Sequence, residues 1–86
     1  MKHAGPAALD ALEDLLSKLR ESPALRERAR GTFYRKSSAF LHFHEDPAGL
    51  FADLKCDGEF ARFPVGTARE RAALLREVRA ELAKLS

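Results

Sequence analysis

The spacing of hydrophobic residues changes twice along this chain, and each change predicts a change of secondary structure. From residue 8 to residue 19 they recur every three or four positions, as on one face of an amphipathic helix. The same spacing returns from residue 68 to residue 85. Between these stretches, Thr32 to Val65 contains all seven aromatic residues, which favours β-strands.

Local signals set the ends of the predicted helices. Thr67 and Glu70 have the spacing of a capping box, in which each side chain bonds the other residue's backbone amide, so the last helix begins there. Ser22-Pro23 followed by Gly31 predicts a short second helix over residues 23–30. The glycine and proline near the start predict that residues 1–6 are frayed.

Two turn signals divide the aromatic stretch. Pro47 suits the second position of a turn over residues 46–49, and Asp57-Gly58 is a strong two-residue hairpin signal. The predicted strands lie near residues 33–45, 50–56 and 59–65. We therefore expect one α+β domain of 86 residues, a three-stranded antiparallel meander flanked by N- and C-terminal helices in the order α-α-β-β-β-α.

The two turns also predict which side chains face the helices. One turn places Leu54 opposite Ala61, and the other places Leu41 opposite Leu54, so both assign apolar pairs to the inner face. A slip of one residue in either hairpin would bury charges instead. Alternation then assigns these side chains to the outward face: Tyr34, Phe40, His42, His44, Phe51, Asp53, Lys55, Phe60 and Arg62.

The aromatic residues of this outward face suggest a function. Each phenylalanine carries about 150–250 Å² of surface, so Phe40, Phe51 and Phe60 together exceed what a monomer normally leaves exposed. The leading hypothesis is a binding or self-associating module whose outward face meets a second copy, as a homodimer, or another protein. The sequence leaves open whether a second subunit, the short helix over 23–30 or nothing covers this face.

Histidines on the same face support an alternative. His42 and His44 are two apart on one strand and project to the same side, with Asp53 opposite, so they could bind a divalent metal or a small ligand. An ion-pair and hydrogen-bond row of His42, Asp53 and Arg62 explains the same residues without a metal. The sequence therefore predicts no cofactor, and the metal site stays the alternative hypothesis.

Catalytic motifs are missing from the sequence. Ser37 and Ser38 lack the context of a nucleophile, and Cys56 is predicted to point inward, away from both strand histidines. The five glycines are scattered singly, so there is no phosphate loop. We expect a protein that is not an enzyme.

Charge and cysteine content narrow the partners. Fifteen basic and thirteen acidic residues are interspersed, which disfavours general nucleic-acid binding, although Arg26, Arg28 and Arg30 form a candidate anion patch. A single cysteine is typical of a reducing compartment. With no export signal and no apolar stretch of roughly 18 residues, the sequence predicts a cytoplasmic protein without a membrane span.

The segment from Ala39 to Lys55, AFLHFHEDPAGLFADLK, followed by Phe63-Pro64-Val65, resembles short stand-alone bacterial proteins of unknown function. The resemblance spans roughly residues 32–82. It implies a small intracellular bacterial protein and transfers no catalytic residue. The strand-turn-strand pattern also resembles, more faintly, the sheet of the YjbR-like family, for which DNA binding is sometimes suspected.

Overall fold

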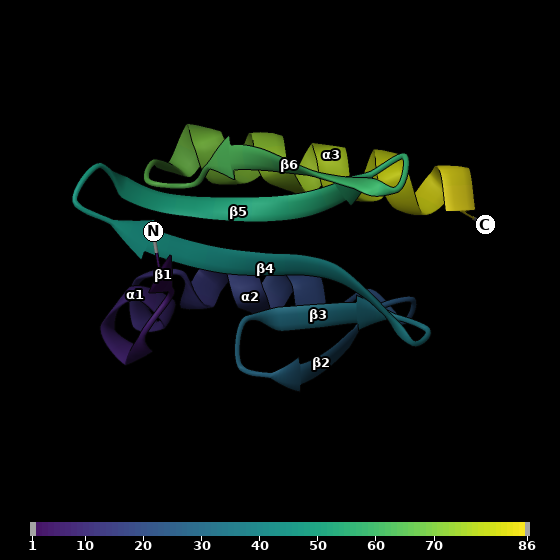
Figure 1. The fold of residues 1–86 in the computed structure, drawn as a ribbon, viewed down its shortest axis with the longest axis horizontal. Coiled ribbons are helices and arrows are strands. Elements are labelled where there is room, and N and C mark those ends of the chain that lie inside the picture. The colour runs from purple at the N-terminus through teal and green to yellow at the C-terminus, as the bar shows by residue number, and fades with distance from the viewer. Residues whose placement is uncertain (1, 86) are drawn as a thin grey trace.

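A computed structural model describes residues 2–85, and its strands form one antiparallel sheet in the order β2-β3-β4-β5-β6, with β1 paired to β4 (Figure 1). The expected three-stranded meander is therefore wrong: these residues contain a five-stranded meander, one further strand and three helices. The elements in chain order are β1 Lys2–His3, α1 Pro6–Ala11, α2 Glu13–Arg20, β2 Arg26–Ala29, β3 Thr32–Arg35, β4 Ser38–Asp46, β5 Gly49–Cys56, β6 Glu59–Pro64 and α3 Ala68–Leu85.

The predicted register of the central hairpins is confirmed. Leu54 of β5 pairs with Leu41 of β4 on one side and with Ala61 of β6 on the other. Asp53, the neighbour of Leu54, lies between His42 and Arg62, as the alternation requires. The turns at 46–49 and at Asp57-Gly58 therefore place one apolar set on the helical side of the sheet.

Residues 23–30 do not form the predicted helix. Arg26–Ala29 is an edge strand, β2, which pairs with β3 and contains a register shift between Glu27 and Ala29. An isolated helix of eight residues is marginal, and this segment offers little apolar surface to stabilise one. Pairing with β3 satisfies the same backbone groups, so tertiary context overrides the capping signals.

The predicted strand over 33–45 is two strands. A two-residue loop, Lys36–Ser37, turns the chain between Arg35 of β3 and Ser38 of β4, which are paired. Lys36 has a φ of 58°, a left-handed conformation that hairpins usually assign to glycine or asparagine. The sequence contains no such residue here, so the turn gave no signal.

Phe40 faces the core, which contradicts its predicted outward position. The register between β3 and β4 shifts, because Tyr34 pairs with Ala39 while Phe33 pairs with Leu41. Phe40 is the extra residue of this bulge, and both it and Leu41 are buried, with 2% and 0% of their surfaces exposed. A bulge interrupts strict alternation, so extrapolation from the hairpins failed at this position.

The start of the chain is ordered rather than frayed. Lys2 and His3 form β1 against β4, beyond the end of β3 on the same edge (Figure 1). The amide of Ala4 donates to the carbonyl of Phe43 at 3.1 Å, and the amide of Gly5 donates to Glu45 Oε2 at 2.6 Å. The part of this prediction that concerns Met1 lies outside the described residues.

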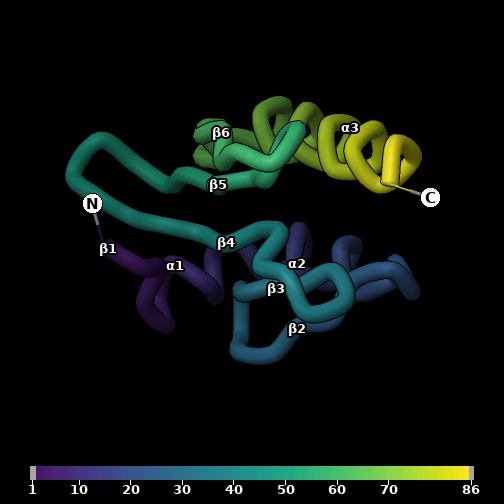
Figure 2. The backbone as a smooth tube through the Cα atoms, turned by 45° about the vertical axis from the view of Figure 1, so that its right-hand side comes forward, coloured from purple at the N-terminus to yellow at the C-terminus, as the bar shows by residue number. Residues whose placement is uncertain are grey.

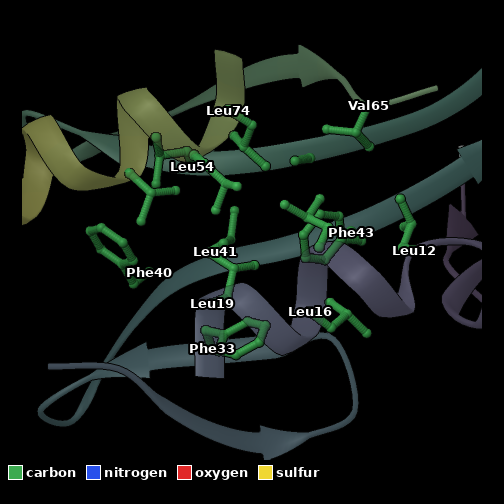
Figure 3. Close-up of a cluster of buried hydrophobic side chains, with 14 of the residues drawn as sticks. Leu12, Leu16, Leu19, Phe33, Phe40, Leu41, Phe43, Leu54, Val65 and Leu74 are labelled. Carbon is green, nitrogen blue, oxygen red and sulfur yellow. The ribbon is translucent and has the colours of Figure 1, made fainter. Parts of the chain in front are cut away.

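The helices cover one face of the sheet, α2 behind β3 and β4 and α3 behind β5 and β6 (Figures 1 and 2). The helix predicted near the start is two short helices that meet at Leu12, and α3 begins with the predicted capping box. None of the described helices is long and apolar enough to cross a bilayer. The core between helices and sheet (Figure 3) includes Leu12, Leu16, Leu19, Phe33, Phe40, Leu41, Phe43, Leu54, Val65 and Leu74.

Candidate metal centre

The three histidines of the chain lie together on the outward face of the sheet. His42 and His44 are two apart on β4, so both side chains leave the same face. The pairing of β1 with β4 places His3 directly opposite His44. One ligand nitrogen from each of the three imidazoles lies within 4.8 Å of the other two.

The imidazole rings are in contact. The ring of His3 stacks on that of His44 with centroids 4.9 Å apart, and the ring of His42 meets His44 edge-on at 4.8 Å. His42 Nδ1 and His44 Nε2 are 2.8 Å apart, which is a hydrogen bond if one of the two nitrogens carries a proton. At least two of the rings are thus held in fixed orientations.

Asp53 determines where that proton lies. Its Oδ2 atom is 3.2 Å from His44 Nε2, and an ionised carboxylate only accepts hydrogen bonds. His44 Nε2 therefore carries the proton and donates to both Asp53 and His42, so His42 Nδ1 is the acceptor. In this tautomer His44 Nδ1 keeps a lone pair, which is buried and has no hydrogen-bond partner among the described residues.

Arg62 holds Asp53 in place. Its Nε and Nη2 atoms donate to the two carboxylate oxygens at 2.8 and 2.9 Å, a bidentate pair across β5 and β6. This pair is the main reason that the pKa of Asp53 is lowered, although only 8% of the residue is exposed. Because Arg62 occupies both oxygens, Asp53 orients His44 rather than serving as a free ligand.

His42 is kept neutral by its surroundings. Burial lowers its pKa first, and the neighbouring His44 lowers it further. A neutral imidazole is the form that donates a lone pair to a metal. At neutral pH His42 therefore has an unprotonated nitrogen beside His44, and a metal ion that binds this nitrogen does not have to displace a proton from it.

The other residues predicted for this face are divided between two places. The ring of Phe60, 45% exposed, lies 4.9 Å from that of His42, and Lys55 Nζ lies 5.4 Å from the centre of Phe60. Phe51 is half-buried and pairs with His44. Tyr34 is separate from this group. Its ring centre lies 4.5 Å from the guanidinium of Arg28, near the β2 edge of the sheet, which is the edge opposite β6.

Sequence reasoning missed His3. A strand of two residues is too short to show alternation, and Gly5 and Pro6 argued for a frayed end. Only its partner strand gives His3 a position, because β4 continues past β3 and leaves the His44–Glu45 edge open for pairing. The number of histidines, all three in one chain of 86 residues, was the sole available hint.

The predicted arginine patch does not form. Arg30 donates to Asp10 and to Glu13, each at 2.8 Å, and its bond to Glu13, with one from Arg20, lowers the pKa of Glu13 to about 2. Arg28 is held over Tyr34. Arg26 lines a cleft together with Arg35 and Lys36 instead.

Three imidazole nitrogens form a recognised donor set. Nitrogen ligands suit zinc, copper, nickel and cobalt, whereas magnesium and calcium prefer oxygen. In a tetrahedral zinc site with bonds of about 2.0–2.1 Å, ligand nitrogens are about 3.4 Å apart. The separations seen here, 2.8 Å for one pair and up to 4.8 Å for the set, lie on either side of that value.

Comparison of the chain with models of protein families, with curated proteins and with solved structures finds no match.

Proposed function

We propose that this protein is a small metal-binding module that holds a divalent transition-metal ion on the imidazoles of His3, His42 and His44. The observation that carries the proposal is the convergence of three ligand nitrogens within 4.8 Å from two paired strands. Three protein ligands leave a coordination position open. His3 is exposed, so an ion could enter from solvent without rearrangement of the core.

The hydrogen bond between His42 and His44 marks a position where the ion could bind. The proton that now joins His42 Nδ1 to His44 Nε2 occupies the place between two lone pairs, and a metal ion in that place would need the other neutral tautomer of His44, with the proton moved to Nδ1. Asp53 Oδ2, held by Arg62 and 3.2 Å from the same His44 Nε2, would lie beside the ion and stabilise its positive charge. This role is binding rather than catalysis, in a reducing cytoplasm where Cys56 remains a thiol.

Thermal unfolding with added Zn²⁺ or Ni²⁺ tests the proposal. A metal ion at about 100 times its dissociation constant stabilises the native state by about 2.7 kcal/mol, which should raise the melting temperature by about 10 °C or more. His3→Ala, at an exposed position, should remove most of this shift while leaving the metal-free melting temperature nearly unchanged.

The matched control is Cys56→Ser, which removes the chain's one thiol and should leave the shift intact. If millimolar metal produced no shift in the wild-type protein, or if Cys56→Ser removed it, the three-histidine site would be refuted. Retention of the full shift in His3→Ala would also contradict it.

Self-association through the outward face is a second proposal. Its support is Phe60, an aromatic side chain left 45% exposed beside the histidines. Burial of Phe60 at a two-fold homodimer interface would remove this apolar surface from water. Phe60→Ser should then shift sedimentation at micromolar concentration from dimer to monomer, and a wild-type monomer would contradict the proposal.

A further inference from the structure

Two clefts share Arg35 and Lys36, at the turn between β3 and β4. This turn precedes the start of β4, whereas the histidines lie farther along that strand and on β1. The larger, about 630 Å³, is lined by Arg26, Arg35 and Lys36 against Pro23, Ala24 and Leu25. The smaller, about 300 Å³, shares Arg35 and Lys36 and adds Ser38, Lys55, Phe40 and Leu85. Each cleft thus combines several cations with an apolar wall.

The cations of these clefts lack acidic partners. None of the described residues that line either cleft is an aspartate or a glutamate. By contrast, Arg20, Arg30 and Arg62 each donate to carboxylates. In a chain with nearly equal numbers of acidic and basic residues, this local excess of cations is a specific property of the clefts.

Individual donors in the clefts are unused. The side chains of Arg26 and Lys36 make no hydrogen bond or ion pair with the described residues. Arg35 donates from Nη2 to the carbonyl of Leu85 at 2.9 Å, but its Nε is buried and has no partner within residues 2–85. A buried donor without a partner is rare in native proteins, and the guanidinium that carries it lines both clefts.

The backbone of Lys36 has an energetically unfavourable conformation. It occupies the first position of a two-residue hairpin loop with a φ of 58°, where glycine is favoured. Asp57 adopts a similar φ of 52° in the other two-residue loop, but Asp-Gly is a usual sequence for such a turn. A strained lysine at the mouth of both clefts is consistent with a binding role for its ammonium group.

We propose that these clefts bind the phosphate group of a small phosphorylated molecule. Arg26, Arg35 and Lys36 surround the larger cleft, and several cations match the double charge and many acceptor oxygens of a phosphate better than the single charge of a carboxylate. The apolar wall that includes Pro23 and Leu25 would receive the organic part. A nucleic-acid strand would instead need a track of free cations, and Arg30 and Arg62 are already paired.

The test uses phenyl phosphate as the probe, followed by calorimetry and by backbone amide chemical shifts at constant ionic strength. The wild-type protein should bind it with shift changes at Arg35 and Lys36. Lys36→Gly should weaken binding about tenfold or more, through loss of a charged hydrogen bond. The same variant should melt at an equal or higher temperature, because glycine suits the turn, so unfolding cannot explain the loss.

Arg79→Gln is the matched control, since Arg79 is an exposed cation on α3 outside both clefts. An equal loss in this variant would show a general charge effect and would overturn the site. Absence of binding at about 10 mM probe would overturn it as well, as would equally strong binding of benzoate. Tighter, sequence-independent binding of a DNA duplex would replace the small-molecule proposal with a nucleic-acid one.

Discussion

The two ends of β4 lie beside groups of opposite chemistry. Toward its C-terminal end, His42 and His44 form a tight cluster with His3, in which Asp53 and Arg62 balance charge and fix a proton. Toward its start, Arg35 and Lys36 surround clefts that contain cations without acidic partners. The first end offers lone pairs to a cation, and the second offers N–H donors to an anion.

The bulge at Phe40 separates these two ends. Because of the bulge, the side chains of Phe40 and Leu41 both enter the core, and these contacts hold the start of β4. The alternation of inward and outward side chains along β4 is interrupted at this point. Phe40 also forms part of the wall of the smaller cleft. A local change of register thus lies between the two ends, and the following variants probe each end separately.

The largest expected effect is on stability at the bulge. Phe40→Ala removes a buried aromatic side chain and should lower the free energy of unfolding by about 3–5 kcal/mol. Phe60→Ala, on the exposed face, should cost less than about 1 kcal/mol. Urea unfolding of both variants measures the difference, and similar losses would show that Phe40 is not a core residue.

The next effect concerns the histidine end alone. Asp53→Asn breaks the bidentate pair with Arg62, because an amide NH2 cannot accept a hydrogen bond, and removes the negative charge beside His44. We expect a loss of about 1–2 kcal/mol, because Arg62 is half-exposed and water screens part of the interaction. Chemical denaturation checks this value, while phenyl phosphate binding at the other end should not change.

A pH titration separates the ends further. The pKa of folded His42 is lower than its ordinary value of 6.5, so the unfolded chain takes up a proton first as the pH falls. The contribution of His42 to stability is thus complete above about pH 6.5 and is lost as the pH falls toward its folded pKa. His42→Gln should flatten the unfolding free energy in this range, whereas Lys36→Gly should leave its slope unchanged.

The lowered pKa of Asp53 predicts a second pH range in which the free energy of unfolding falls. Its contribution to stability is present above its ordinary pKa of 3.8 and is lost as the pH falls through the lower folded value. Asp53→Asn should reduce the loss of stability at acid pH, to which Glu13 also contributes, and should retain the loss near neutrality. A single phase that disappears in both His42→Gln and Asp53→Asn would contradict the separate assignments.

The smallest expected change in the free energy of unfolding comes from the two loop residues with left-handed backbone conformations, Lys36 and Asp57. Lys36→Gly should raise the free energy of unfolding by about 0.5–1 kcal/mol, because it relieves a φ of 58°. Asp57→Gly should change it less, since aspartate already tolerates this conformation. A destabilised Lys36→Gly protein in thermal or urea unfolding would indicate that the lysine contributes contacts that outweigh the strain.

Turn chemistry explains which parts of the fold were predictable. Asp57-Gly58 and Pro47 are strong local signals, and they determine the register that places Asp53 between His42 and Arg62. The loop at Lys36–Ser37 has no such signal, so β3 and β4 were read as one strand. The bulge at Phe40 depends on how β3 pairs, which no local pattern reveals.

The same distinction applies to the candidate site. His42, His44 and Asp53 were predictable because strand alternation places them together. His3 was not, because its position depends on an edge of β4 that only the folded sheet leaves open. The segment at 23–30 also illustrates this, since its capping residues favour a helix but pairing with β3 makes it a strand.

X-ray absorption spectroscopy of the zinc-loaded protein tests the central claim most directly. The account predicts one zinc ion per chain with three imidazole nitrogens at about 2.0–2.1 Å, reduced to two in His3→Ala. A spectrum with two or fewer imidazole ligands in the wild-type protein, or one unchanged by His3→Ala, would contradict a centre built from β1 and β4.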